Sequence, residues 1–108
     1  EISTLSSLSH PNVVKFVDSH ACLSCSFIVM EYCNGGSLEQ VLKFHAAQNM
    51  ILDESLLWHL FEGLVAAIGH CHSGPSYSKG WCPIIYSDLK PSNVLLSTTP
   101  GMSYPTVK

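Results

Sequence analysis

The segment from Asp53 to Gly74 carries the strongest periodic pattern in the chain and limits the fold more than any other feature. Its apolar side chains recur at steps of three and four residues, which places them on one face of an α-helix: Leu57, Leu60, Phe61, Leu64, Ile68 and Cys71. Asp53 belongs to the residue types that cap a helix start, and Gly74 followed by Pro75 blocks continuation. The pattern predicts a long amphipathic helix that packs one face against other parts of the chain.

A short helix and a β-hairpin are predicted ahead of this long helix. Apolar residues at helical spacing predict a helix over residues 1–8, which the turn-forming "SHPN" ends. Residues 13–20 are rich in β-branched and aromatic side chains, and residues 27–32 form a continuous apolar run suited to a buried strand. Because a turn-like stretch joins the two segments, they predict a hairpin.

A second capped helix and two short apolar runs complete the pattern. Ser37 is followed three residues later by Gln40, which is the spacing of a capping box at a helix start. Residues 83–85 and 93–96 are short apolar runs that predict two short strands. The order of helix, two strands, helix, long helix and two short strands is typical of the α+β class.

Composition excludes several classes of protein. Apolar residues make up 46% of the 108 residues and charged residues only 12%, which is too apolar for a disordered segment. The net charge of −3 indicates no basic patch, so we expect neither a nucleic-acid partner nor a membrane partner. No apolar run is long enough to span a bilayer, and the first residues lack the pattern of a secretory signal. We therefore expect an intracellular location, in the cytoplasm or nucleus.

The cysteines leave two readings open. Five cysteines is an odd number, and without a secretory signal we expect reduced thiols. The alternative is a small zinc module built from "CLSC" at residues 22–25 and "HCH" at residues 70–72. Zinc modules usually separate their histidines by three to five residues, whereas one residue separates them here. The reduced thiols are the favoured reading.

Three chemically capable side chains gather in the loop "YSDLKPSN" at residues 86–93, between the two apolar runs. Asp88, Lys90 and Asn93 can hold a proton, a phosphate group and a metal ion. Phosphoryl transfer requires an acceptor hydroxyl in line with the phosphate, cationic charge on the phosphate oxygens and a nearby magnesium ion. A short loop closed by a proline can point all three groups into one cleft. This loop resembles the catalytic loop of protein kinases.

The resemblance assigns a role to each residue of the loop. Asp88 is expected to orient the substrate hydroxyl and take its proton. Lys90 is expected to neutralise charge on the transferring phosphoryl group, and Asn93 to bind a magnesium ion and brace the loop. A lysine two residues after the aspartate, followed by Pro91, resembles the serine/threonine-specific branch of the family.

Two further segments are similar to kinases in the correct order. Residues 1–18 resemble the end of the small-lobe helix and the strand after it, so Glu1 matches the glutamate that pairs with a small-lobe lysine. "FIVMEYCNGGSL" at residues 27–38 resembles the strand and hinge that join the two lobes.

The hinge resemblance implies four further residues at the nucleotide site. Met30 falls at the gatekeeper position, and the backbone of Glu31 and Cys33 is expected to hydrogen-bond the adenine edge of ATP. Leu95 is expected to lie under the adenine ring. Together with Glu1, these residues are the predicted cofactor-binding set.

The resemblance covers nearly the whole chain and implies a partial protein-kinase fold. Residues 1–33 are expected to form a remnant of the small lobe with the hinge, and residues 34–108 the start of the large lobe. The implied activity is that of a serine/threonine protein kinase, which transfers the γ-phosphoryl group of ATP to protein hydroxyls with ATP and Mg²⁺ as cofactors and a protein substrate as partner. Trp58 and the end of the long helix are most similar to the NIMA-related group.

The sequence also departs from the family pattern. Tyr86 and Ser87 stand where the family usually has His and Arg, which predicts activity independent of an activation-loop phosphate bound at this arginine position. The change also keeps open an alternative, a pseudokinase that acts as a binding or scaffold module. The glycine-rich loop, the small-lobe lysine and the D-F-G aspartate are not among residues 1–108. We therefore expect this chain alone to be inactive and prone to aggregate, with apolar strand edges and an apolar helix face in water.

Overall fold

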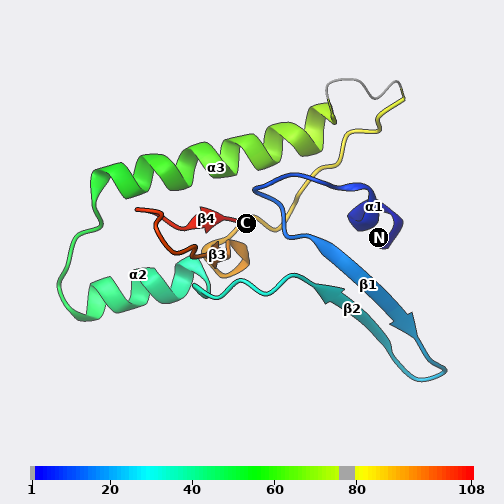
Figure 1. The fold of residues 1–108 in the computed structure, drawn as a ribbon, viewed down its shortest axis with the longest axis horizontal. Coiled ribbons are helices and arrows are strands. Elements are labelled where there is room, and N and C mark those ends of the chain that lie inside the picture. Colours follow the sequence, from blue (N-terminus) through cyan, green and yellow to red (C-terminus); the bar gives the residue numbers. More distant parts are fainter. Residues whose placement is uncertain (1, 76–79) are drawn as a thin grey trace.

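The computed structural model describes residues 2–75 and 80–108, and has the mixed α+β order that the sequence predicts (Figure 1). Glu1 and residues 76–79 lie outside the described residues. The elements in chain order are α1 (Ile2–Ser7), β1 (Phe16–Ala21), β2 (Ser26–Met30), α2 (Leu38–Ala47), α3 (Glu54–Ser73), the 3₁₀ turn η1 (Pro91–Asn93), β3 (Leu96–Ser97) and β4 (Thr106–Val107).

The ends of the two longer helices are set by the predicted capping residues. The Ser37 hydroxyl accepts a hydrogen bond from the Gln40 N–H (3.3 Å), and the Gln40 side chain accepts one from the Ser37 N–H (2.8 Å). This is the capping box of α2. Asp53 caps α3 by accepting from a backbone N–H of its first turn (3.1 Å). Gly74 ends α3 at a positive φ of 69°, a conformation that glycine adopts without steric cost.

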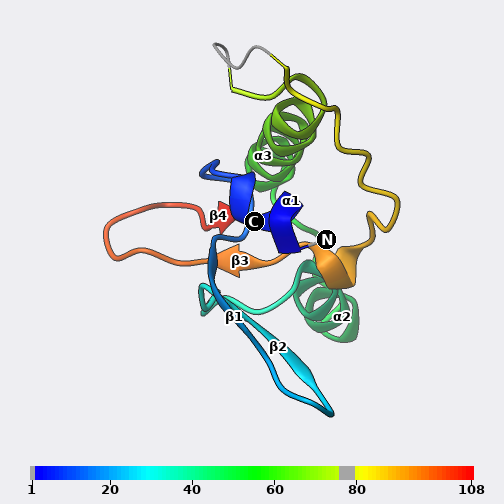
Figure 2. The same ribbon diagram turned by 90° about the vertical axis from the view of Figure 1, so that its right-hand side faces the viewer.

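The β1–β2 hairpin forms as predicted but is not buried. Its strands pair antiparallel from Phe16↔Met30 to Ala21↔Ser26, with an irregularity near Val17. The hairpin projects away from the helices in both views (Figures 1 and 2), and every residue of β2 is exposed. The prediction of a buried strand over residues 27–32 is therefore wrong for this chain: among the described residues α1 contacts β1, whereas β2 is exposed along its whole length. The predicted exposure of apolar strand surface is confirmed.

A small core lies where α3 meets the β3–β4 pair. The buried side chains Leu60, Val94, Leu96 and Val107 form one cluster, with Leu38, Val41, Leu56 and Leu64 packed against it. The β3–β4 pair lies between α2 and α3 (Figure 1), so it joins the two helices through one set of apolar contacts. Other apolar side chains of α3 remain exposed, as expected for this chain alone: Leu57, Trp58, Phe61 and Val65.

The first of the two predicted short strands, at residues 83–85, is wrong. Residues 83–85 adopt no strand, because the Ile84 N–H donates to the Cys71 carbonyl at the end of α3 (2.9 Å) and has no neighbouring strand as partner. The partner of β3 is β4 instead, with Leu96↔Val107 and Ser97↔Thr106 in register. Between β3 and β4 the chain turns back on itself over residues 98–105.

Two side-chain contacts hold the tail against the first turns of α3. A ring nitrogen of His59 lies 2.9 Å from the Pro105 carbonyl oxygen, and the Tyr104 hydroxyl donates to the Asp53 carboxylate (3.2 Å). These contacts place β4 beside α3, where Val107 enters the core.

Two glycines of α3 are expected to respond oppositely to substitution by alanine. A methyl group at Gly63 would lie 3.0 Å from Val107 Cβ and 3.0 Å from Asn12 Nδ2, whereas at Gly69 it would meet nothing within 4 Å. Gly69→Ala should stabilise the protein by about 0.5–1 kcal/mol through helix propensity. Gly63→Ala should destabilise it, since overpacking costs about 1–3 kcal/mol. Urea unfolding of the two variants tests the contrast, and equal shifts in midpoint would contradict the described packing of α3 on β4.

Candidate active site

The three predicted catalytic side chains lie in direct contact. One oxygen of the Asp88 carboxylate pairs with Lys90 Nζ (2.9 Å) and accepts a hydrogen bond from Asn93 Nδ2 (2.8 Å). Asn93 Nδ2 also lies 3.0 Å from the Asp88 backbone carbonyl oxygen. The side chains of Asp88 and Lys90 are 63% and 52% exposed, so the group faces solvent. A carboxylate, a cation and an amide therefore converge on one accessible point.

The local sequence explains how the loop folds. Pro91 begins the single 3₁₀ turn η1, where its fixed φ suits the turn and its missing N–H removes no hydrogen bond. The Asn93 N–H donates to the Lys90 carbonyl (2.9 Å), which turns the Asn93 side chain back toward Asp88. Val94, the next residue, is buried in the core and anchors the loop to the rest of the fold.

The same contacts keep Asp88 ionised. Hydrogen bonds from Lys90 first, and from Asn93 second, hold the pKa of the Asp88 carboxyl below its ordinary value. A carboxylate at neutral pH can accept a hydrogen bond from a substrate hydroxyl and orient it. The loop therefore has the charge state that its predicted role requires.

The geometry also fits one part of a magnesium site. Asn93 uses its amide nitrogen on Asp88, so its amide oxygen points elsewhere and has no hydrogen-bond partner among residues 2–75 and 80–108. Magnesium prefers oxygen ligands and needs about six, so Asn93 can supply only one of them. Within the part of the chain that the structure describes, no group of three or more His, Cys, Asp or Glu side chains could hold a metal ion, and the zinc alternative has no support.

Of the predicted nucleotide-site residues, Met30 ends β2, and Glu31 and Cys33 lie on the segment that follows it. Leu95 lies directly before β3 and forms a β-bridge with Ser37. Met30 ends the strand with an exposed side chain, and Cys33, three residues later, is buried. Burial raises the pKa of the Cys33 thiol, which keeps it protonated. Among the described residues, the Glu31 carbonyl and the Cys33 N–H make no backbone hydrogen bond. These two groups remain available to a ligand. Glu1, predicted to bind the cofactor, lies outside the described residues.

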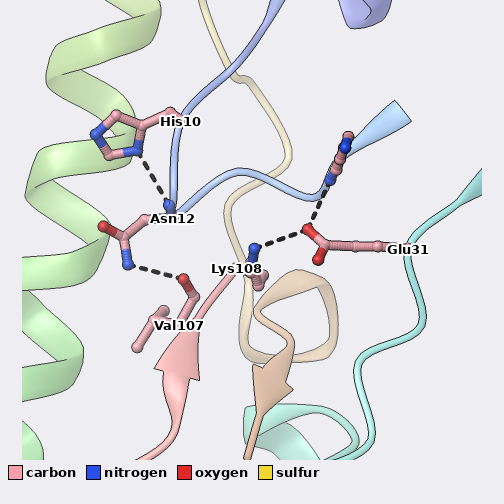
Figure 3. Close-up of polar contacts among 6 residues, drawn as sticks. His10, Asn12, Glu31, Val107 and Lys108 are labelled. Atoms are coloured by element: carbon pink, nitrogen blue, oxygen red, sulfur yellow. Dashed lines mark hydrogen bonds and ion pairs between the residues drawn. The ribbon is translucent and has the colours of Figure 1, made fainter. Parts of the chain in front are cut away.

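The Glu31 side chain joins this segment to the end of the chain (Figure 3). Its Oε1 accepts hydrogen bonds from the Lys15 N–H (2.7 Å) and from Lys108 Nζ (2.8 Å). Lys108 in turn exchanges two backbone hydrogen bonds with Leu95, at 2.8 and 2.9 Å. Lys108 therefore contacts both Glu31 and Leu95, two of the residues predicted at the nucleotide site. No pattern in the sequence pointed to Lys108.

The sequence also did not predict the contacts made by the "HPN" segment at residues 10–12. Asn12 donates from its backbone N–H to His10 Nδ1 (3.1 Å) and from its side chain to the Val107 carbonyl (2.9 Å) (Figure 3). The segment ends the first helix, as the sequence predicts, and it also joins the residues after α1 to β4. A depression of about 260 Å³ opens beside it, lined by Leu8, Ser9, His10, Pro11, Val13, Lys15, Glu31 and Lys108. That depression contains no residue of the loop at 88–93, which stands open to solvent.

The cysteine prediction requires a correction. Cys22 and Cys25 form a disulfide in the turn of the β1–β2 hairpin, so these two are not the free thiols that the sequence analysis expected. The turn makes the pairing possible because it holds their Cα atoms 5.3 Å apart, within the range for a disulfide. Cys33, Cys71 and Cys82 are free.

The ion pair between Glu31 and Lys108 is expected to contribute measurably to stability. The two side chains are only 27% and 13% exposed, so Lys108→Met should lower the free energy of unfolding by about 1–3 kcal/mol. The same substitution at Lys43, whose pair with Glu39 is exposed, should cost less than about 0.5 kcal/mol. Urea unfolding at pH 7 gives both values.

The pH dependence provides a second check on this pair. The hydrogen bond from Lys108 is the main cause that holds the pKa of Glu31 below its ordinary value. A lowered folded-state pKa means that the stabilisation is present above the unfolded-state pKa and is lost as the pH falls through the folded-state value. The difference between wild type and Lys108→Met should therefore shrink below about pH 4. A difference that is constant between pH 7 and pH 3 would contradict the pairing.

The chain belongs to the protein kinase domain family, whose pattern matches residues 1–106. The resemblance inferred from the loop and hinge is thereby confirmed, as is a partial kinase fold of α+β character. Its relatives include serine/threonine-protein kinases. The chain is 35% identical to the serine/threonine-protein kinase Nek2 of Homo sapiens over 89% of its length, and 42% identical to the serine/threonine-protein kinase RUNKEL of Arabidopsis thaliana over 89%.

A third relative extends the likeness to the NIMA group. The chain is 32% identical, over 91% of its length, to the G2-specific protein kinase nimA of Emericella nidulans. The chain spans only 21%, 6% and 17% of the lengths of these three relatives, in the order given. Among the described residues, no helix combines the length and the apolar character needed to cross a membrane.

Proposed function

We propose that this chain supplies the hinge and the catalytic loop of a serine/threonine protein kinase. The complete protein transfers the γ-phosphoryl group of ATP to a hydroxyl group of a protein substrate. The observation that carries this proposal is the contact of Asp88 with both Lys90 and Asn93 in an accessible loop. Membership of the protein kinase domain family supports it.

In this proposal the loop positions the acceptor and balances its charge. The Asp88 carboxylate accepts a hydrogen bond from the substrate hydroxyl and takes its proton as the phosphoryl group moves. Lys90, 2.9 Å from Asp88, turns its ammonium toward the phosphoryl oxygens when substrate is bound. Asn93 offers its amide oxygen to a magnesium ion, which neutralises phosphate charge when bound.

The nucleotide lies against the segment after β2. The Glu31 carbonyl and the Cys33 N–H hydrogen-bond the adenine edge, Met30 limits the depth of the pocket, and Leu95 lies beneath the ring. Residues 1–33 belong to the small lobe and hinge, and residues 34–108 begin the large lobe. Glu1 pairs with a small-lobe lysine outside this chain. Because ATP is the donor, the activity belongs inside the cell, in the cytoplasm or nucleus.

The competing proposal is a pseudokinase that binds a partner without transferring phosphate. Tyr86 and Ser87 favour it, since the family usually carries His and Arg at these positions. Asp88, Lys90 and Asn93 favour the enzyme, because a scaffold has no need of all three groups in contact.

The experiment measures phosphate transfer by the full-length protein that contains this chain. It is incubated with γ-labelled ATP, Mg²⁺ and a generic protein substrate, and the labelled amino acids are identified after hydrolysis. Label on serine or threonine supports the proposed function. Nucleotide binding without transfer supports the pseudokinase, and label on tyrosine alone contradicts the assigned specificity.

A further inference from the structure

The turn of the β1–β2 hairpin holds two cysteines that the proposed kinase reaction does not use. Cys22 and Cys25 are joined by a disulfide, with two residues between them. The Cys22 N–H donates to the Cys25 carbonyl (2.8 Å), which closes the turn and keeps the two Cα atoms 5.3 Å apart. The backbone by itself therefore brings the two sulfur atoms together.

Both cysteines are open to solvent. All residues from 21 to 30 are exposed, and the hairpin points away from the rest of the molecule (Figures 1 and 2). Cys33 and Cys71, in contrast, are buried, and burial raises the pKa of both thiols. Small oxidants and reductants can reach the turn but not these two buried thiols.

The fold does not depend on the disulfide. The pair Ala21↔Ser26 directly flanks the turn, and the strand ladder continues from there to Phe16↔Met30. A bond across two residues closes a very short loop, which is the case in which a disulfide constrains the unfolded chain least. Opening the bond should therefore leave the hairpin and the core in place.

We propose that Cys22 and Cys25 form a reversible dithiol–disulfide site that exchanges with small-molecule disulfides such as oxidised glutathione. One cysteine thiolate attacks a sulfur of glutathione disulfide, which forms a mixed disulfide and releases one glutathione. The second thiolate then attacks the protein sulfur of that mixed disulfide and releases the other glutathione. The two cysteines lose two electrons and two protons, and glutathione disulfide gains both to become two molecules of reduced glutathione. The reverse reaction restores the dithiol.

The test counts accessible thiols in the full chain after equilibration in glutathione buffers of increasing oxidised fraction. Samples are labelled under native conditions at neutral pH with excess maleimide, which also stops the exchange by consuming the free thiols, and are then weighed by mass spectrometry. We expect three labels under reducing conditions, on Cys22, Cys25 and the exposed Cys82. Under oxidising conditions Cys22 and Cys25 should take no label and no glutathione, because they pair with each other, whereas Cys82, as a single exposed thiol, should gain one glutathione. The transition should reverse when reduced glutathione is added back.

Three variants make the result specific. Cys82→Ser should keep the two-thiol transition, because it removes only the unrelated thiol. Cys22→Ser and Cys25→Ser should each lose it and form a glutathione adduct instead. Far-ultraviolet circular dichroism should be unchanged between the reduced and oxidised chain. The proposal is overturned if the pair stays as thiols at every oxidised fraction or if excess reduced glutathione leaves the bond intact. None of these readouts depends on kinase activity.

Discussion

Asp88→Asn is expected to lower kcat of the full-length kinase by about 10²–10⁴-fold, the usual contribution of a general base. The amide keeps the shape of the side chain and can still accept a hydrogen bond from Asn93. It loses the negative charge that pairs with Lys90, and with it the charge that orients the substrate hydroxyl in the proposed function. KM for ATP should change little, because in the proposed function Asp88 binds the acceptor hydroxyl and not the adenine ring.

Asp53→Asn provides the matched control for this variant. The substitution is chemically identical, but Asp53 caps α3, and asparagine caps helices as well as aspartate does. The kcat of Asp53→Asn should stay within about twofold of wild type. A loss of kcat in Asp88→Asn then comes from the loop at 86–93 and not from a general loss of folded protein. A loss of less than tenfold in Asp88→Asn, with nucleotide binding intact, would refute the role of Asp88 as base and favour another proton acceptor.

Leu60→Ala is expected to unfold the isolated chain. Leu60 is 5% exposed and lies in the cluster with Val94, Leu96 and Val107. Truncating a buried leucine removes its transfer free energy and leaves a cavity, which together cost about 2–5 kcal/mol. Only six apolar side chains are buried among the described residues, so the chain has little stability in reserve. Urea unfolding followed by circular dichroism measures the loss.

Leu57→Ala on the same helix is the control for the core. Leu57 is 47% exposed, so the same truncation leaves no cavity and should cost about 1 kcal/mol or less. If both substitutions lowered the free energy of unfolding equally, the buried face of α3 would not be the one that contains Leu60. The isolated chain is also expected to aggregate more readily than a complete kinase domain, because its β2 and α3 apolar side chains face water. Light scattering at increasing protein concentration measures this tendency.

Features governed by neighbouring residues could be predicted from the sequence. Ser37 and Gln40, three residues apart, form the capping box, and Asp53 and Gly74 mark the ends of α3. The loop belongs to the same class, because the contact between Asp88 and Asn93 spans a single turn closed by Pro91. Such contacts depend on local backbone preferences, which the residue types themselves express.

Features governed by distant residues could not be predicted. The apolar run at residues 83–85 has the composition of a strand, yet within the part of the chain that the structure describes it pairs with no strand. The apolar run of β2 suits a buried strand, yet its residues are all exposed. The cysteine count favoured free thiols, whereas the geometry of the hairpin turn joins Cys22 to Cys25.

By itself, the sequence determined the α+β order, the capped helix ends and the residues that gather in the loop at 86–93. Only the tertiary structure decided that Lys108 joins Glu31 to Leu95 and that Asn12 holds β4. The physical reason is distance along the chain: the bond from Lys108 to Glu31 joins residues 77 positions apart, and that from Asn12 to Val107 joins residues 95 positions apart. Local backbone preferences do not predict such pairs. They form only when the core of Leu60, Val94, Leu96 and Val107 packs β4 against α3.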